Sequence, residues 1–110
     1  MQADIASNNN WSISISTNDF AKCYLLFHGS NFVSKSEDAF MLLSKCPLPI
    51  AQSLRSQLVT HTIQENGGTL AYQTIATDNR IKYGSDFYDY LDELTLREFA
   101  NQGINLSYHT

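Results

Sequence analysis

The sequence has few of the residues that build nucleic-acid, metal or cofactor sites. It has 7 Lys and Arg against 11 Asp and Glu, and its net charge is −4. Non-specific binding to nucleic acid depends on clustered basic residues, so we expect no direct nucleic-acid partner. The two cysteines and three histidines show none of the spacings of zinc or redox motifs, and no acidic loop suits a hard cation. We therefore expect neither a metal nor a cofactor.

Long apolar runs are also missing. No segment approaches the ~18 apolar residues that a membrane-spanning helix needs. The first ten residues lack the basic and apolar regions of a secretory signal. We expect no membrane partner and a cytoplasmic location, where Cys23 and Cys46 would be reduced thiols.

What the sequence does contain suits a folded protein. Of its 110 residues 43% are hydrophobic and 16% are charged, which is typical of a globular chain of one-domain size. We predict a single domain over residues 1–110, of which residues 1–10 form a flexible tail. The expected class is α+β, an antiparallel sheet of about five to six strands with about three to four short helices packed on one face.

The first half of the chain predicts strands and then helices. Residues 11–16 alternate between apolar residues and serines, which is the pattern of a half-buried strand, and residues 17–19 suit a turn. Residues 21–28 fit either a second strand or a helix, and we favour the strand because Gly29 follows so soon.

Two helices are predicted next. Ser34 and Glu37 have the spacing of a capping box for a helix over residues 35–45, which Pro47 ends. Pro49 suits the first turn of another helix. The second helix carries an apolar stripe at intervals of four residues, Ile50, Leu54 and Leu58.

From Val59 the apolar pattern changes to a period of two. Asn66–Gly67 is typical of a hairpin turn, and Asp78–Asn79 suggests another, so we predict three strands between residues 59 and 83. Both turns give registers that place the same side chains on one face, with His61 opposite Tyr72. That face comprises Val59, His61, Ile63, Leu70, Tyr72, Ala76, Ile81 and Tyr83.

Residues 85–99 hold the charge asymmetry of the chain. They contain five acids and one base, while the remaining residues hold six of each. Helical periodicity and a second capping box at Thr95–Glu98 predict two short helices, over residues 86–93 and 96–102, with Gly103 as the residue after the second. A last strand is expected over residues 104–108.

The acidic helix is the predicted partner-binding site. Its carboxylates form a row of negative charge, and the tyrosine beside them is of a type common at interface hot spots. The residues are Asp86, Tyr88, Asp89, Asp92 and Glu93. The competing interpretation is the solvated face of an ordinary amphipathic helix.

A small enzyme is a second hypothesis. Cys23 or His61 would act in a pocket between sheet and helices, although no local motif accompanies either residue. Cys23 and His28 lie five residues apart, which places them on opposite faces of a strand.

The main hypothesis is a small acidic, non-enzymatic protein-binding module. It would inhibit or neutralise a partner protein with a basic, nucleic-acid-binding surface, because complementary charge speeds encounter and fixes register. The chain is similar in size and charge to phage or mobile-element inhibitors of defence systems such as anti-CRISPR proteins. No motif supports this similarity. The chain is similar in the same way to toxin-neutralising immunity proteins. A structural or assembly subunit is a further alternative.

Overall fold

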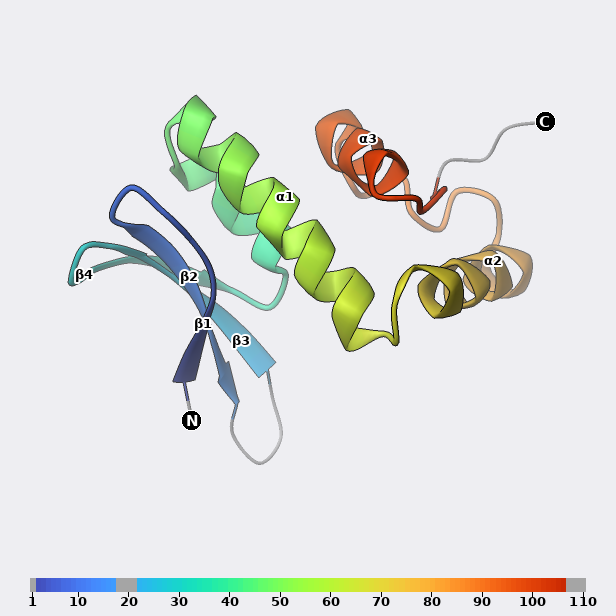
Figure 1. Ribbon diagram of the computed structural model, residues 1–110, viewed down its shortest axis with the longest axis horizontal. Coiled ribbons are helices and arrows are strands. Elements are labelled where there is room, and N and C mark those ends of the chain that lie inside the picture. Colours follow the sequence, from blue (N-terminus) through green and yellow to red (C-terminus); the bar gives the residue numbers. More distant parts are fainter. Residues whose placement is uncertain (1, 18–21, 107–110) are drawn as a thin grey trace. The chain divides into compact units, whose positions relative to one another are not determined.

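The computed structural model describes residues 2–17 and 22–106, which form one antiparallel sheet of four strands and four helices (Figure 1). The predicted α+β class is confirmed, and the sheet has four strands rather than five to six. The elements in chain order are β1 (Gln2–Asn8), β2 (Trp11–Thr17), β3 (Lys22–His28), β4 (Asn31–Ser36), the 3-10 helix η1 (Ala39–Lys45), α1 (Leu48–Glu65), α2 (Thr69–Tyr83) and α3 (Glu93–Asn101).

The chain forms two compact units, and the boundary between them falls within α1. Unit 1 is Met1–Leu58 and unit 2 is Val59–Thr110. Unit 1 has four acidic and four basic residues, whereas unit 2 has seven acidic and three basic residues. All of the net charge therefore belongs to unit 2. That residues 1–110 make one domain stays a prediction.

The sheet is a meander in which each strand pairs with the next. Its order is β1-β2-β3-β4 and every pair is antiparallel. The strand predicted from the alternation at residues 11–16 is confirmed as β2. The strand favoured over a helix for residues 21–28 is confirmed from Lys22 onward as β3. Residues 18–21, where most of the first predicted turn falls, lie outside the described part of the chain.

Strand β1 corrects the prediction of a flexible tail at residues 1–10. Asn8 pairs with Trp11 across a two-residue turn, in which Asn9 and Asn10 have positive φ angles of 48° and 74°. Two consecutive positive φ angles are the geometry of a type I′ turn, which asparagine tolerates better than most residues. The short asparagine run is therefore a hairpin signal.

One face of the sheet forms the core of unit 1. Ile13 and Leu26 lie opposite each other on β2 and β3 and are completely buried. Helix residues complete this core, namely Ala39, Leu42, Leu43, Ile50, Ala51, Leu54 and Leu58. The predicted stripe of Ile50, Leu54 and Leu58 is thus confirmed. On the other face, Ser14 donates a hydrogen bond of 2.5 Å to the Asp4 carboxylate.

The helix predicted over residues 35–45 is shorter and begins later. Residues 31–36 belong to β4, and η1 starts at Ala39 because the Asp38 carboxylate accepts a hydrogen bond of 3.0 Å from the Phe40 amide. The Ser34–Glu37 capping box was the wrong start signal. The predicted end before Pro47 is confirmed, with Cys46 as the C-cap.

Helix α1 continues through the residues predicted as the first of three strands. The end of α1 uses Asn66–Gly67 as a helix stop instead of a hairpin turn. The Gly68 amide donates to the Ile63 carbonyl at 2.9 Å and the Gly67 amide to the Gln64 carbonyl at 3.2 Å, while Gly67 has a φ of 94°. This is a Schellman motif. The predicted pairing of His61 with Tyr72 is therefore wrong.

Helix α2 replaces the other two predicted strands, so the predicted single face from Val59 to Tyr83 does not form. Of that set, Val59, Ile63 and Ala76 are buried, whereas Leu70, Ile81 and Tyr83 are exposed. Thr95, Phe99, Ile104 and Leu106 are also buried in unit 2.

Helix α3 ends as predicted. Gly103 has a φ of 94°, and the Ile104 amide donates to the Phe99 carbonyl at 2.8 Å, which makes a second Schellman motif. The strand predicted for residues 104–108 is not formed over residues 104–106, and residues 107–110 lie outside the described chain. Asn105 instead bonds through its main chain to the Gln73 side chain, at 2.6 Å and 3.2 Å.

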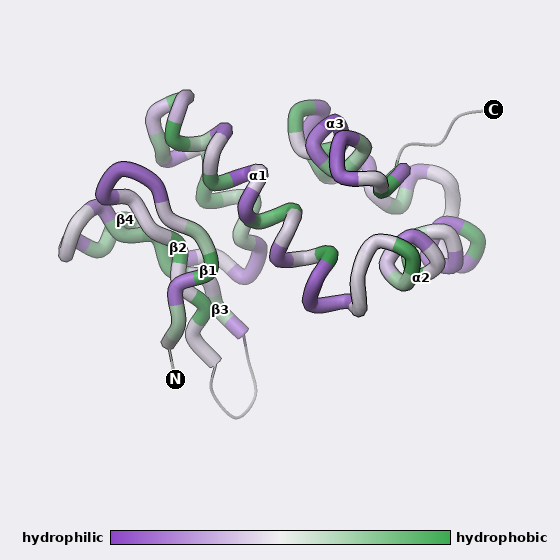
Figure 2. The backbone as a smooth tube through the Cα atoms, viewed as in Figure 1, coloured by the Kyte–Doolittle hydropathy of each residue, from purple (hydrophilic) through white to green (hydrophobic). Residues whose placement is uncertain are grey.

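Hydrophobic and hydrophilic stretches alternate along α1 and α2 without a long apolar run (Figure 2). Among the helices of the described residues, none has both the length and the apolar character needed to cross a membrane.

Candidate functional site

The acidic segment folds as consecutive turns that lead from α2 to α3. Each turn closes with a hydrogen bond between residues three apart. The amides of Phe87, Asp89 and Leu91 donate to the carbonyls of Gly84, Asp86 and Tyr88 at 3.2 Å, 2.9 Å and 3.1 Å. The first predicted helix, over residues 86–93, is therefore corrected to a series of turns.

An aromatic cluster fixes these turns against the end of α2. The rings of Tyr83 and Phe87 stack at 4.8 Å with an interplanar angle of 20°, and Phe87 meets Tyr88 edge-on at 4.9 Å. The Asn79 side-chain amide donates a hydrogen bond of 2.9 Å to the Tyr88 hydroxyl. Tyr88, expected at the border of the acidic row, is 6% exposed and belongs to the interior of unit 2.

Two of the predicted carboxylates have structural roles in α3. Asp92 is the N-cap of the helix, and its side chain accepts a hydrogen bond of 2.8 Å from the Thr95 amide. The helix consequently begins at Glu93 and not at the predicted residue 96, because Asp92 supersedes Thr95 as the cap. Glu93 pairs with Arg97 at 2.9 Å on an exposed helix face. Such a pair contributes only about 0.3–0.5 kcal/mol.

Asp86 and Asp89 are exposed residues of the turn series. The structure thus brings Asp86 and Asp89 together on one turn, whereas Asp92 and Glu93 follow at the start of α3. Whether these five residues bind a partner stays a prediction.

Exposed apolar side chains accompany the acids, and the sequence reasoning missed them as site residues. Tyr90 is 68% exposed and Ile81 is 80% exposed, and Tyr83 and Leu94 are about half exposed. In the strand interpretation Ile81 and Tyr83 belonged to one face of the predicted sheet. Reading residues 69–83 as a helix would have grouped Leu70, Thr74, Thr77 and Ile81 on one face, away from the buried Ala76.

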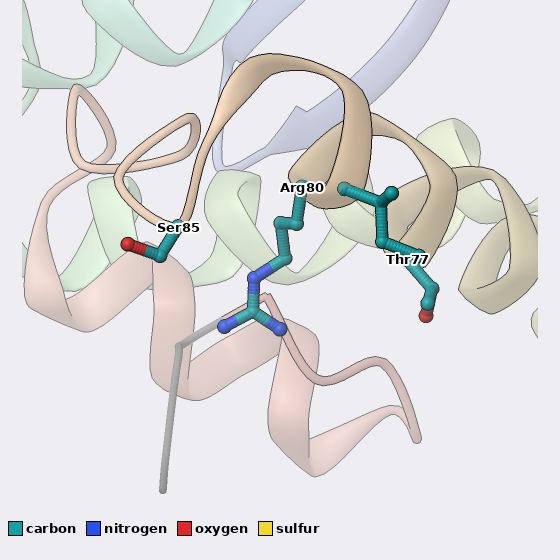
Figure 3. A pocket seen from close by; sticks show the side chains of 4 residues that line it. Thr77, Arg80 and Ser85 are labelled. Carbon is teal, nitrogen blue, oxygen red and sulfur yellow. The ribbon is translucent and has the colours of Figure 1, made fainter.

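A shallow pocket opens where α2 meets the turns. It has a volume of about 290 Å³ and is lined by Thr77, Arg80, Ile81 and Ser85. In Figure 3 the Arg80 guanidinium extends from α2 between the side chains of Ser85 and Thr77. The Nε and Nη2 atoms of Arg80 are shielded from solvent. This pocket was not predicted from the sequence, because it depends on residues one turn apart on a helix.

No protein-family model, curated protein or solved structure matches this chain.

The histidines and cysteines of the enzyme hypothesis lie in separate places. Cys23 is on β3 next to Ser16 of β2, whereas His28 is on the opposite face, where its ring stacks on Trp11 at 4.2 Å. His61 is half-buried on α1. Cys46 is a free thiol beside the core of unit 1, and burial raises its pKa. Over residues 2–17 and 22–106, no three or more His, Cys, Asp or Glu side chains are grouped so that they could hold a metal ion.

Proposed function

We propose that the protein is a non-enzymatic binding module that attaches to a basic surface of a partner protein. The observation that carries this proposal is the coincidence of charge and exposed apolar surface in unit 2. Asp86 and Asp89 lie on the same turn series as Tyr90, which is 68% exposed. Exposed aromatic residues combined with one sign of charge are typical of protein-binding surfaces.

The charge favours a partner whose surface normally meets nucleic acid. Unit 2 has seven acidic residues against three basic ones, so its field attracts clustered Lys and Arg and repels phosphates. Occupying such a surface would block the partner from DNA or RNA, which is the action of an inhibitor or neutraliser. Such a target would place the encounter in the cytoplasm, and an inhibitor carried by a phage or mobile element would act in this way.

The five residues predicted as the site take different parts in this proposal. Asp86 and Asp89 are the contact residues, because their exposed carboxylates have no role in a helix end. Asp92 and Glu93 add charge while they also serve α3. Tyr88 supports the turn from inside, and Tyr90 replaces it as the exposed aromatic contact.

A competition assay tests the proposal. An arginine- and lysine-rich DNA-binding peptide is bound to labelled DNA, and fluorescence anisotropy records whether the protein displaces the DNA. The Asp86→Asn/Asp89→Asn variant should compete about tenfold less well, because two rim charges together contribute on the order of 1.4 kcal/mol.

A matched control removes the same amount of charge elsewhere in unit 2. Glu65 and Asp78 are exposed and lie outside the acidic segment. The Glu65→Gln/Asp78→Asn variant should compete like the wild-type protein. Equal losses in the two variants would mean that only net charge matters, and the proposed surface would then be wrong.

A further inference from the structure

The pocket beside the acidic segment is shallow and has room for an aromatic side chain. Its volume of about 290 Å³ is at the lower end of the range of about 300–1,000 Å³ for small-molecule pockets. Thr77, Arg80 and Ile81 project from successive turns of α2, and Ser85 closes the pocket from the turn series.

The lining favours an aromatic guest. Ile81 is 80% exposed, and a ring placed against it would remove apolar surface from water. The methylene stem of Arg80 adds apolar contact beside Ile81. The hydroxyls of Thr77 and Ser85 are neutral. The only full charge among these four residues is positive, which disfavours a basic side chain inside the pocket itself.

The turn series beside the pocket carries acids, whereas Lys82 of α2 lies over the Tyr83 ring, 5.2 Å from its centroid. Ser85 is followed directly by Asp86, and the turn bond of 2.9 Å between the Asp89 amide and the Asp86 carbonyl holds both acids on the same turn. The stacked rings of Tyr83 and Phe87 connect this turn to the end of α2. Chain that flanks a guest in the pocket would therefore lie near the turn that carries the exposed Asp86 and Asp89.

We propose that the pocket receives an aromatic side chain of the partner, and that Lys or Arg residues flank that side chain and contact Asp86 and Asp89. The inference rests on the proposed function and defines its partner segment as an aromatic residue between basic ones. Interface hot spots form where an aromatic side chain of one protein becomes desolvated in a recess of the other and the surrounding contacts exclude water.

Two peptides of equal charge test the inference. The first is Lys-Lys-Ser-Phe-Ser-Lys-Lys, and the second has Ser in place of Phe. Amide chemical shifts of the isotope-labelled protein report where each peptide binds and how tightly. We expect the first peptide to bind about fivefold more tightly and to shift the amides of Thr77, Ile81 and Ser85.

Two variants of α2 provide the control. Ile81 and Leu70 are 80% and 85% exposed on the same helix, and only Ile81 lines the pocket. Ile81→Ser should abolish the preference for the aromatic peptide, whereas Leu70→Ser should retain it. If both variants lose the preference, the peptide recognises the exposed face of α2 and the pocket inference is wrong.

The same titrations separate this inference from the proposed function. If both peptides bind equally and Asp86→Asn/Asp89→Asn weakens both, the acidic surface stands and the aromatic recess is overturned. If neither peptide binds at low salt, both proposals fall together.

Discussion

The side-chain amide of Gln57 bonds to both main-chain groups of Ser7. The Ser7 amide donates to Oε1 at 2.9 Å, and Nε2 donates to the Ser7 carbonyl at 2.8 Å. Ser7 is on β1, which has β2 on one side and forms an edge of the sheet. The glutamine thus occupies a position that a neighbouring strand would otherwise take, and it shields part of an edge that could template aggregation.

Replacing Gln57 should weaken unit 1. Gln57→Ala removes both hydrogen bonds to Ser7. From the net contribution of two such bonds we expect the free energy of unfolding to fall by about 1–2 kcal/mol. Gln52→Ala is the matched control, because Gln52 is exposed on the same helix. Urea unfolding followed by the fluorescence of Trp11, the only tryptophan, measures both. Equal stability of the two variants would contradict the role assigned to Gln57.

Gly103 should not tolerate a side chain. Its φ of 94° is unfavourable for L-residues, and an added Cβ would lie 3.0 Å from Cγ2 of Thr69. We expect Gly103→Ala to destabilise unit 2 by about 1–2 kcal/mol from the backbone conformation, with a further loss from the contact. Thr69→Ser removes that methyl group, so the loss should be smaller in the Thr69→Ser background. Thermal unfolding of the two single variants and the double variant gives the coupling; additive losses would exclude the contact.

Two substitutions of Asp92 should distinguish its role as a helix cap from its role as a negative charge. Asp92→Ala removes the acceptor of the Thr95 amide and should cost about 1 kcal/mol, whereas Asp92→Asn keeps a cap of similar quality. Both variants lose one negative charge, so they should compete for the basic DNA-binding peptide equally well. Urea unfolding by circular dichroism should thus distinguish two variants that the anisotropy assay does not. A destabilised Asp92→Asn variant would show that the charge, and not the cap, stabilises α3.

Alkaline pH should destabilise unit 2 through Tyr72. Burial, with smaller contributions from Tyr88 and Tyr90, raises the pKa of Tyr72 to about 12. The unfolded chain loses this proton near pH 10 while the folded state retains it, so the free energy of unfolding falls between about pH 10 and 12. Below about pH 10 the Tyr72 hydroxyl keeps its proton in both the folded and the unfolded state, so its titration does not lower the free energy of unfolding there.

Tyr72→Phe should reduce this loss of stability. The measurement is the change in the denaturation midpoint between pH 9 and pH 11. Tyr83→Phe is the control, since it removes a phenol from a ring that is more than half exposed. If Tyr72→Phe and the wild-type protein lose the same stability over this range, the raised pKa is wrong.

The fold was predictable where one local signal had one meaning. The alternation around Ile13 specified a strand, and the stripe ending at Leu58 specified a helix. Asn66–Gly67 had two meanings, because hairpin turns and helix C-termini both need a positive φ. The β-branched residues of the segments around it then favoured strands by propensity, although Val59 and Ile63 follow Ala51 at multiples of four residues and so continue the helical spacing beyond Leu58. Tertiary packing in unit 2 stabilises helices on both sides of Asn66–Gly67.

The candidate site was predictable in its charge and not in its shape. Composition alone locates the acids of residues 85–99, whereas the orientation of Tyr88 depends on Asn79, which a strand interpretation places elsewhere. Thr95 was the predicted cap, whereas the helix uses Asp92, three residues earlier. The pocket at Ile81 needed α2 to be a helix, so no signal in the assumed strand pattern could reveal it.

The unequal division of charge between the units also gives the molecule a preferred way of attaching to solid supports. Unit 1 is neutral in sum and unit 2 carries the whole surplus of −4. On an amine-coated bead or sensor the protein would adsorb by unit 2, because the amines attract that unit's negative charge. Coupling chemistry that leaves the acidic turns available for binding should therefore be directed to the other unit, where Cys23 and Cys46 provide the only thiols of the chain.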